Sequence, residues 1–564
     1  MKRYLAIIPI LVCLIAMAAA GPADDALNLA LTLKGNGDLQ GAVKAAVDGL
    51  ALAPNDFKLN LFAGDLFYEL GQYQESFAAY QKALGEKNKD LDALRGAGRS
   101  ALKLGRYQDA ASYFENGLKK KKSAEFHYWL GTAQMELGNY PEADLNLRKA
   151  IDKEAKNASY HLALGEINYR NKVYSITIAE FRKAMELDSE VEKTVTDLHY
   201  KLAQSFIQLR NLDDAIVEFR KELELHPKDT TSWLELGNIT QLANRYSDAA
   251  FCYVKFLEIV PNDGERWFSL GVLYLNLRDQ EKAAESFEKA VSLKAREAES
   301  YGYLASIYSD RKEFEKAWDA YNRFEGVFGT PDSVLYWFDK GKVAIKLGSR
   351  DIAFFDTALA CFKRSADLDF SFSAAYEYAG LSMYYKREYA AAIPYFLKKI
   401  ELDSSSVNSL RNLAFCYLKL ESYDNAAATF EKALVIKPED TQMRSMLGKI
   451  YSYNEKYVSA IKHFEILLND YSADLTDSLR CVVYPDLGLS YLKQAKCNDA
   501  VSVLLKAEQC KSNELSVLFN IASAYQLCNK MKEANDYYKK VLRIDPGNKD
   551  AIKGEMMTTK QGED

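Results

Sequence analysis

The chain has 564 residues, too many for one ordinary domain, so it must contain several domains or a repeating array. Its 11 prolines and 29 glycines include no Ser-, Gly- or Pro-rich tract that would mark a linker, which favours an array. Lys and Arg total 73 against 79 Asp and Glu, giving a net charge of −6. Without a basic excess to neutralise phosphates, nucleic acid is not an expected partner.

The first twenty residues have the layout of a secretory signal peptide. Lys2 and Arg3 precede an apolar run from Tyr4 to Ala16, and small residues at 18–20 offer a cleavage site before Gly21. The apolar core is shorter than the roughly 20 residues that span a bilayer, which favours cleavage over an uncleaved anchor. No later stretch is apolar enough to cross a membrane. The mature chain is therefore expected in the periplasm or outside the cell, without a transmembrane segment.

A helical repeat begins at Ala23 and continues almost to the end of the chain. Its clearest unit runs from residue 265 to 293, where key residues recur at intervals of three and four, as on one face of a helix. On the first helix these residues are Trp267, Leu270, Gly271 and Tyr274. On the second they are Ala283, Phe287 and Ala290. Small residues would let the two helix axes approach, and large aromatic residues would fill the remaining space.

This W-x2-L-G-x2-Y and A-x3-F spacing resembles the tetratricopeptide repeat family. The small residue of the first helix recurs in fifteen units: Ala30, Gly64, Gly98, Gly131, Gly165, Ala203, Gly237, Gly271, Ala305, Gly341, Gly380, Ala414, Gly448, Gly488 and Ala522. The resemblance implies an all-α fold, a right-handed superhelical solenoid of about fifteen helix-turn-helix repeats over residues 21–548. Residues 549–564 are expected to form a capping helix and a polar tail.

Departures from the repeat period mark insertions. Extra residues fall near Glu192 to Val195, Asp332 and Ser333, Arg350 to Phe354, and Leu475 to Arg480. The insertion near Arg350 brings Ile352, Phe354 and Phe355 between two helices of one unit. We expect an extended helix end packed on its neighbour, with an exposed apolar contact for a partner as the alternative.

Aromatic residues are frequent on the expected inner surface of the array. By resemblance to the family, positions 2, 5, 6, 9, 12 and 13 of each first helix face a concave groove. The large aromatic residues there are Phe62, Tyr68, Tyr128, Trp129, Tyr169, Tyr200, Phe268, Tyr303, Phe338, Tyr378, Tyr384, Tyr385, Phe415, Tyr453 and Phe519. Rigid aromatic side chains interleaved with charges are typical of peptide-binding surfaces. About half of them could instead pack between neighbouring first helices.

The sequence gives little support for a catalytic or metal-binding site. His127, His161 and His199 occupy the same position of three successive units. Packed helices place equivalent residues on the order of 10 Å apart, too far to share a zinc ion whose ligands lie about 2.0 Å away. We therefore expect packing roles for them. With no phosphate loop and no nucleophile elbow, the sequence predicts no enzyme activity, no cofactor and no metal site.

Four cysteines lie in the last two repeats. Folding the hairpins would place Cys481 beside Cys510 and Cys497 beside Cys528. In an oxidising compartment these pairs are expected to form disulfides, although sequence alone does not fix connectivity. A zinc site is disfavoured because the chain has no CxxC pair.

The expected function is therefore a non-catalytic interaction scaffold or adaptor of the cell envelope. It would bind a protein or an extended peptide along the concave face. The alternative is a module that binds a glycan or cell-wall polymer in the same aromatic groove, since stacked aromatics also suit sugar rings. Nothing in the pattern sets an oligomeric state.

Overall fold

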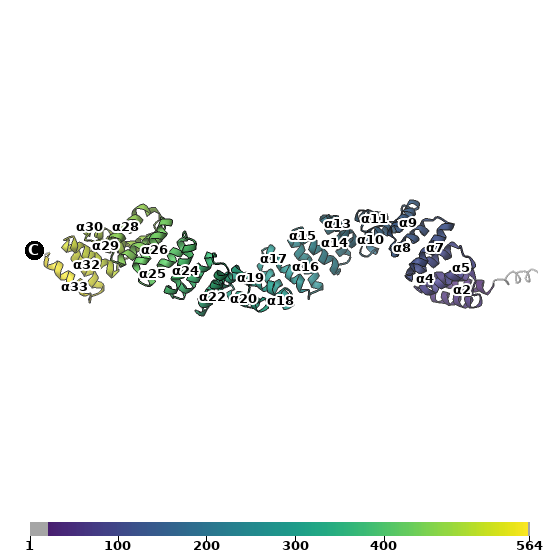
Figure 1. Ribbon diagram of the computed structural model, residues 1–564, viewed down its shortest axis with the longest axis horizontal. Helices are drawn as coiled ribbons and strands as arrows, with labels where there is room; N and C mark the ends of the chain where they lie inside the picture. The colour runs from purple at the N-terminus through teal and green to yellow at the C-terminus, as the bar shows by residue number, and fades with distance from the viewer. Residues whose placement is uncertain (1–20, 562–564) are drawn as a thin grey trace, which may run out of the picture. The chain divides into compact units, whose positions relative to one another are not determined.

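A computed structural model describes residues 21–561 of the chain. The expected signal peptide, residues 1–20, lies outside the described residues. Within residues 21–561 all regular structure is helical, with 32 α-helices and one 3-10 turn. The chain divides into two compact units, one ending at Asp279 and the other beginning at Gln280, and each is described by itself (Figure 1).

Unit 1 consists of consecutive antiparallel helix pairs. In chain order its helices are α2 (Pro22–Gly35), α3 (Leu39–Leu52), α4 (Phe57–Glu69), α5 (Tyr73–Glu86), α6 (Leu91–Lys103), α7 (Tyr107–Lys120), α8 (Ala124–Glu136), α9 (Tyr140–Lys153), α10 (Ala158–Arg170), α11 (Tyr174–Leu187), α12 (Val191–Thr194), α13 (Leu198–Gln208), α14 (Leu212–Leu225), α15 (Thr230–Leu242), α16 (Tyr246–Ile259) and α17 (Gly264–Asn276). Each first helix from α2 to α15 packs on the second helix that follows it, as α4 does on α5.

Unit 2 has the same organisation. Its helices are α18 (Gln280–Ser292), α19 (Glu297–Asp310), α20 (Phe314–Phe328), α21 (Val334–Leu347), α22 (Ala353–Leu368), α23 (Ser373–Tyr385), α24 (Tyr389–Leu402), α25 (Val407–Lys419), α26 (Tyr423–Ile436), α27 (Thr441–Tyr453), α28 (Tyr457–Asp470), η1 (Ser472–Asp474), α29 (Asp477–Lys493), α30 (Cys497–Cys510), α31 (Leu515–Leu527), α32 (Met531–Ile544) and α33 (Lys549–Gln561).

Local sequence signals set where these helices begin and end. Asp56, Asp90 and Asp440 are among the residues whose side chains accept hydrogen bonds from the first turn of a following first helix. Second helices end just before Pro54 and Pro438, as expected from their missing N–H groups. The chain is thereby cut into helices of nearly constant length.

Small residues facing large ones hold each hairpin together, as the sequence predicts. A Cβ atom added to Gly98 in α6 would lie 2.4 Å from the ring of Phe114 in α7. In unit 2 a Cβ on Gly448 would lie 2.6 Å from the ring of Phe464. Both rings are fully buried. The predicted all-α class and helix-turn-helix repeat are therefore confirmed.

The insertions lengthen or add helical turns. Residues 191–194 form the short helix α12, which buries Val191. At the insertion near Arg350, Phe355 is buried and Phe354 packs edge-on against Trp318, whereas Ile352 is exposed. The expected packing of an extended helix end is thus observed for Phe354 and Phe355, while a partner contact at the exposed Ile352 stays a prediction.

The last helix packs on the last repeat. α33 contacts both α31 and α32, and Ala551 is buried. Met556, which the helical spacing of the sequence groups with Ala551, is exposed, because Gly554 and Thr558 form the closely packed positions of this helix. Among residues 21–561, no helix combines the length and apolar character needed to span a bilayer.

Candidate functional site

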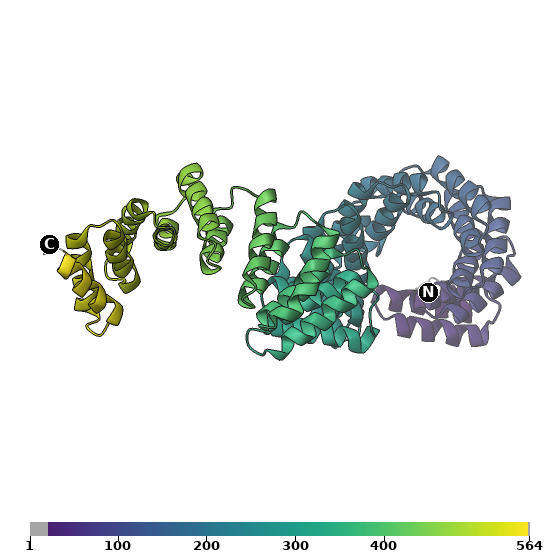
Figure 2. The same ribbon diagram turned by 60° about the vertical axis from the view of Figure 1, so that its left-hand side comes forward.

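The first helices α2, α4, α6, α8 and α10 of unit 1 form a continuous surface. Each of the first four contacts the next one in this order. Figure 2 shows the helices of unit 1, purple to blue, following a curved path. First helices that touch across the intervening second helix lie on the inner side of such a curve. We call the surface formed by Tyr68, Arg99, Trp129, Glu166 and Lys201 the inner face.

One end of the inner face is a cluster of aromatic rings around a cation. The Arg99 guanidinium of α6 lies 4.5 Å from the ring centre of Tyr68 in α4 and 5.3 Å from that of Trp129 in α8. Trp129 also contacts the Tyr128 ring, with centroids 4.7 Å apart. Cation–π contacts of this kind fix the rings in place and keep the positive charge near the surface. The structure thus brings together three of the predicted groove residues.

A network of charges joins the middle of the inner face. Glu166 in α10 pairs with Lys201 in α13 at 2.7 Å and with Arg170 at 2.9 Å, and Arg170 reaches Glu136 in α8 at 3.2 Å. Burial raises the pKa of Glu166, but hydrogen bonds from Lys201 and Arg170 outweigh it, and the pKa is lowered overall. The carboxylate therefore stays ionised, and the network links three successive first helices.

Beside this network the inner face is hollowed. A cavity of about 310 Å³, here called the inner hollow, is lined by Tyr128, Thr132, Met135, Ser159, Leu162, Ala163, Glu166, Phe181, Val195, Asp197, Leu198 and Lys201. Val195 and Asp197, in the segment between α12 and α13, are part of its lining. An apolar floor with charges at one side suits a large side chain of a partner.

The remaining predicted groove residues are scattered. In unit 1, Phe62, Tyr169 and Tyr200 are half-buried and Phe268 is buried. In unit 2, Phe338 packs against Tyr378 with centroids 5.1 Å apart. Tyr303 packs on Phe287, Phe415 on Phe430, and Phe519 on Tyr538. Tyr384 packs on its neighbour Tyr389, while Tyr385 and Tyr453 are exposed.

Sequence reasoning missed the apolar residues of the inner hollow. Met135, Leu162, Ala163 and Val195 are not large aromatics, so a search for aromatic positions passes over them. The four-residue insertion near Val195 was the available signal, because Val195 lies in it and lines the hollow.

The three aligned histidines hold hairpins together. Their Nδ1 atoms contact the same position of each following second helix: Asn146 at 2.9 Å, Glu180 at 2.6 Å and Glu218 at 2.6 Å. Each histidine is buried. In the part of the chain that the structure describes, no cluster of His, Cys, Asp and Glu side chains could hold a metal ion.

The pair formed by His199 and Glu218 makes stability depend on pH. Burial raises the pKa of Glu218, but the hydrogen bond with His199 and the charge of Lys221 lower it further, below its usual 4.5. A lowered folded-state pKa adds stability above the unfolded-state value, and that stability is lost as pH falls through the folded-state pKa. Glu218→Gln should therefore cost roughly 1 kcal/mol near neutral pH, and this cost should shrink progressively as the pH falls below about 4.5.

Thermal unfolding of both proteins across this pH range measures the effect. Glu224→Gln, an exposed change in the same helix, is the control and should shift the melting temperature little at any of these pH values. A constant difference between Glu218→Gln and the native protein across the pH range would contradict the assignment.

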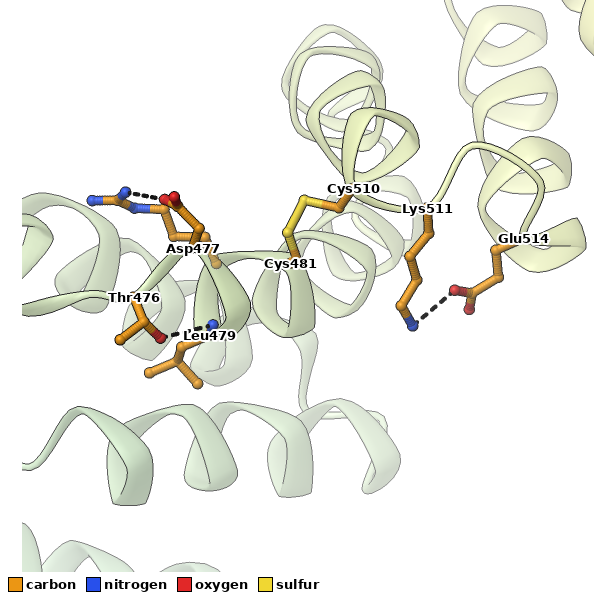
Figure 3. The surroundings of a disulfide bond; sticks show 8 residues. Thr476, Asp477, Leu479, Cys481, Cys510, Lys511 and Glu514 are labelled. Atoms are coloured by element: carbon orange, nitrogen blue, oxygen red, sulfur yellow. Dashed lines mark hydrogen bonds and ion pairs between the residues drawn. A yellow bond between two sulfur atoms is a disulfide. The ribbon is translucent and has the colours of Figure 1, made fainter.

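All four cysteines of the last repeats are paired. Cys481 of α29 is bonded to Cys510 at the end of α30, and Cys497 at the start of α30 is bonded to Cys528 after α31 (Figure 3 shows the first bond). Three further cysteines are buried thiols: Cys252, Cys361 and Cys416. Burial raises the pKa of the Cys361 thiol to about 11. These thiols are therefore poor nucleophiles at neutral pH.

Comparison with known proteins identifies the repeat. Two sequence profiles described as tetratricopeptide repeat match the chain, the first over residues 27–90, 95–146, 131–184, 200–255 and 379–441, and the second over 264–297 and 515–548. Together they cover more than half of the chain.

Individual relatives are distant. Protein O-mannosyl-transferase TMTC1 of Homo sapiens is 21% identical over 34% of this chain and 22% of its own length. Anaphase-promoting complex subunit 3 of Schizosaccharomyces pombe is 27% identical over 24% of this chain and 19% of its own length. The chain thus spans about a fifth of each of these relatives. The crystal structure of YrrB, described as a TPR protein with an unusual peptide-binding site, is 20% identical, covers 34% of this chain and 95% of its own, and has a TM-score of 0.29.

Proposed function

Because the chain belongs to the tetratricopeptide repeat family, we propose that it is a non-catalytic scaffold or adaptor of the cell envelope that holds a protein or extended peptide against its first helices. Repeats of this family typically serve protein–protein interaction. In this proposal residues 1–20 are removed as a signal peptide, residues 21–548 form the repeat array, and residues 549–564 cap it and end in a polar tail. The paired cysteines agree with an oxidising compartment.

The inner hollow is the observation that carries the binding proposal. It combines apolar lining from Met135, Leu162 and Ala163 with the charges of Glu166 and Lys201. An apolar pocket beside fixed charges can anchor one large side chain and orient the chain on either side of it. The rings of Trp129 and Tyr68 extend the same face toward the N-terminus.

Filling the inner hollow tests this site. Ala163 lines the hollow in α10, so Ala163→Phe should occupy it and weaken partner binding about tenfold or more. The probe is a peptide selected from a random library on the native protein, and fluorescence anisotropy measures its affinity. Ala179→Phe is the matched control, because Ala179 is exposed on the second helix of the same repeat.

Equal effects of the two substitutions would reject the inner hollow as the binding site. The same experiment examines the glycan alternative. If soluble cell-wall oligosaccharides raise the melting temperature of the native protein but not of Ala163→Phe, and no peptide is selected, the partner is a glycan rather than a protein.

A further inference from the structure

Unit 2 carries a row of exposed side chains at the ends of its first helices. Each residue is the last or second-to-last of its helix, and cationic residues alternate with apolar or aromatic ones. In order along α21, α23, α25, α27, α29 and α31, the residues of this end row are Lys346, Tyr385, Lys419, Tyr453, Lys493 and Leu527. The three lysines are exposed, and Tyr385, Tyr453 and Leu527 are 51%, 56% and 46% exposed.

The three lysines have no acidic partner. No carboxylate pairs with Lys346, Lys419 or Lys493 among the described residues. Unit 1 differs at the same repeat position, where Glu69 pairs with Lys34 and Glu136 with Arg170. Lys103, at the same position of α6, is the one charged residue at these helix ends in the described part of unit 1 that also has no ion pair.

Helix stability alone does not explain the end row. A lysine at the C-terminal end of a helix interacts favourably with the helix dipole, which accounts for a lysine at any one of these positions. It does not account for the tyrosines and the leucine that occupy the intervening helix ends with about half of their surface in water. Large apolar side chains held at a surface favour contact with a partner.

The helices of the end row form two runs of neighbours: α21, α23 and α25 contact in turn, and so do α27, α29 and α31. Packed helices lie about 10 Å apart, so residues on alternate helices of one run, such as Lys346 and Lys419, lie about 20 Å apart. An extended peptide advances about 3.3 Å per residue. Acidic residues roughly six positions apart, with an apolar residue midway between them, would therefore match the end row.

We propose that the end row of unit 2 binds an extended acidic peptide segment whose carboxylates recur about every six residues and alternate with apolar side chains. This inference rests on the proposed function and names the chemistry of the partner for unit 2. A uniformly acidic polymer would satisfy the lysines but offer no apolar group to the exposed parts of Tyr385, Tyr453 and Leu527, of which Tyr385 is also stacked on Phe355. A peptide can supply both kinds of group at the required spacing.

Synthetic peptides test the spacing. One has glutamates about six residues apart with a leucine midway between each pair; a second has the same composition with the glutamates adjacent. Fluorescence anisotropy on the native protein should show binding of the first about tenfold tighter than of the second, and weaker binding at higher salt. Equal affinities would overturn the proposed register.

Matched lysine substitutions test the site. Lys346→Gln, Lys419→Gln and Lys493→Gln together should weaken binding about tenfold, the effect of losing three exposed ion pairs. The control replaces Lys363, Lys432 and Lys462 by Gln, which are exposed on second helices α22, α26 and α28 and change the net charge equally. Equal weakening by both triple variants would show attraction to net charge only and overturn the proposal.

Two further comparisons separate the possible outcomes. If an oligogalacturonate binds with the same dependence on Lys346, Lys419 and Lys493 while neither peptide does, the end row binds a glycan, and the peptide proposal is wrong. Ala163→Phe in unit 1 should leave binding of the spaced peptide unchanged. The Ala163→Phe variant therefore tests only the proposal for the inner hollow, and the lysine variants test only the proposal for the end row.

Discussion

Replacing Phe464 by Ala is expected to lower the free energy of opening of the α27–α28 hairpin by about 3–5 kcal/mol. The Phe464 ring is 1% exposed and lies against Gly448, where no side chain could close the space left behind. The loss therefore includes both the transfer of the ring out of water and the cost of an unfilled cavity. Because repeats contact mainly their neighbours, the effect should be strongest in this hairpin and in α26 and α29, which pack on it.

Hydrogen exchange of peptides from α27 and α28 measures this change. Val458→Ala in the same helix is the control, because Val458 is 68% exposed and its loss should change the opening free energy by less than about 0.5 kcal/mol. Similar exchange rates in the two variants would show that the Phe464 ring does not hold the hairpin together.

Removing both disulfides is expected to destabilise the end of the array by roughly 2–4 kcal/mol for each bond. The two bonds close loops with sequence separations of 29 and 31 residues, and they join α30 to both of its neighbours. Replacing Cys481, Cys510, Cys497 and Cys528 by Ser frees the unfolded chain from both constraints. Hydrogen exchange in α29 to α31 should then rise, while α19 to α25 should be unaffected.

Reduction provides the internal control for this change. The native protein treated with a reductant should match the variant, and the variant should not respond to the reductant. Peptide mapping under non-reducing conditions, on protein recovered from cells, also checks the compartment. Free thiols at all four positions would contradict both the bonds and an oxidising location.

The packing of the repeats could be predicted from sequence because it depends on single residues at fixed positions. Gly98 and Gly448 mark where helices approach, Phe114 and Phe464 fill the space, and Pro54 and Pro438 end second helices. Such signals act between residues close in sequence. They identify a hairpin without knowledge of the rest of the chain.

The surface could be predicted only in part. Trp129, Tyr128 and Tyr68 do gather, because Arg99 on the first helix between theirs contacts both Tyr68 and Trp129. Phe268 is buried and Phe338 packs on Tyr378, since an aromatic ring on a helix gains more from a neighbour than from water. The inner hollow is lined from α8, α10, α11, α13 and the segment after α12, an arrangement in space that residue type alone does not determine.

Nearly all helix contacts in each unit join elements that follow one another in the chain. A hairpin can thus close as soon as its own segment is available, without waiting for residues made later. Even Cys481 and Cys510 are separated by only 29 residues, which is less than the distance in sequence between equivalent positions of successive repeats, such as Gly64 and Gly98. Such a molecule can acquire its structure progressively from one terminus, so that only short stretches of apolar surface are open to aggregation at any moment during biosynthesis.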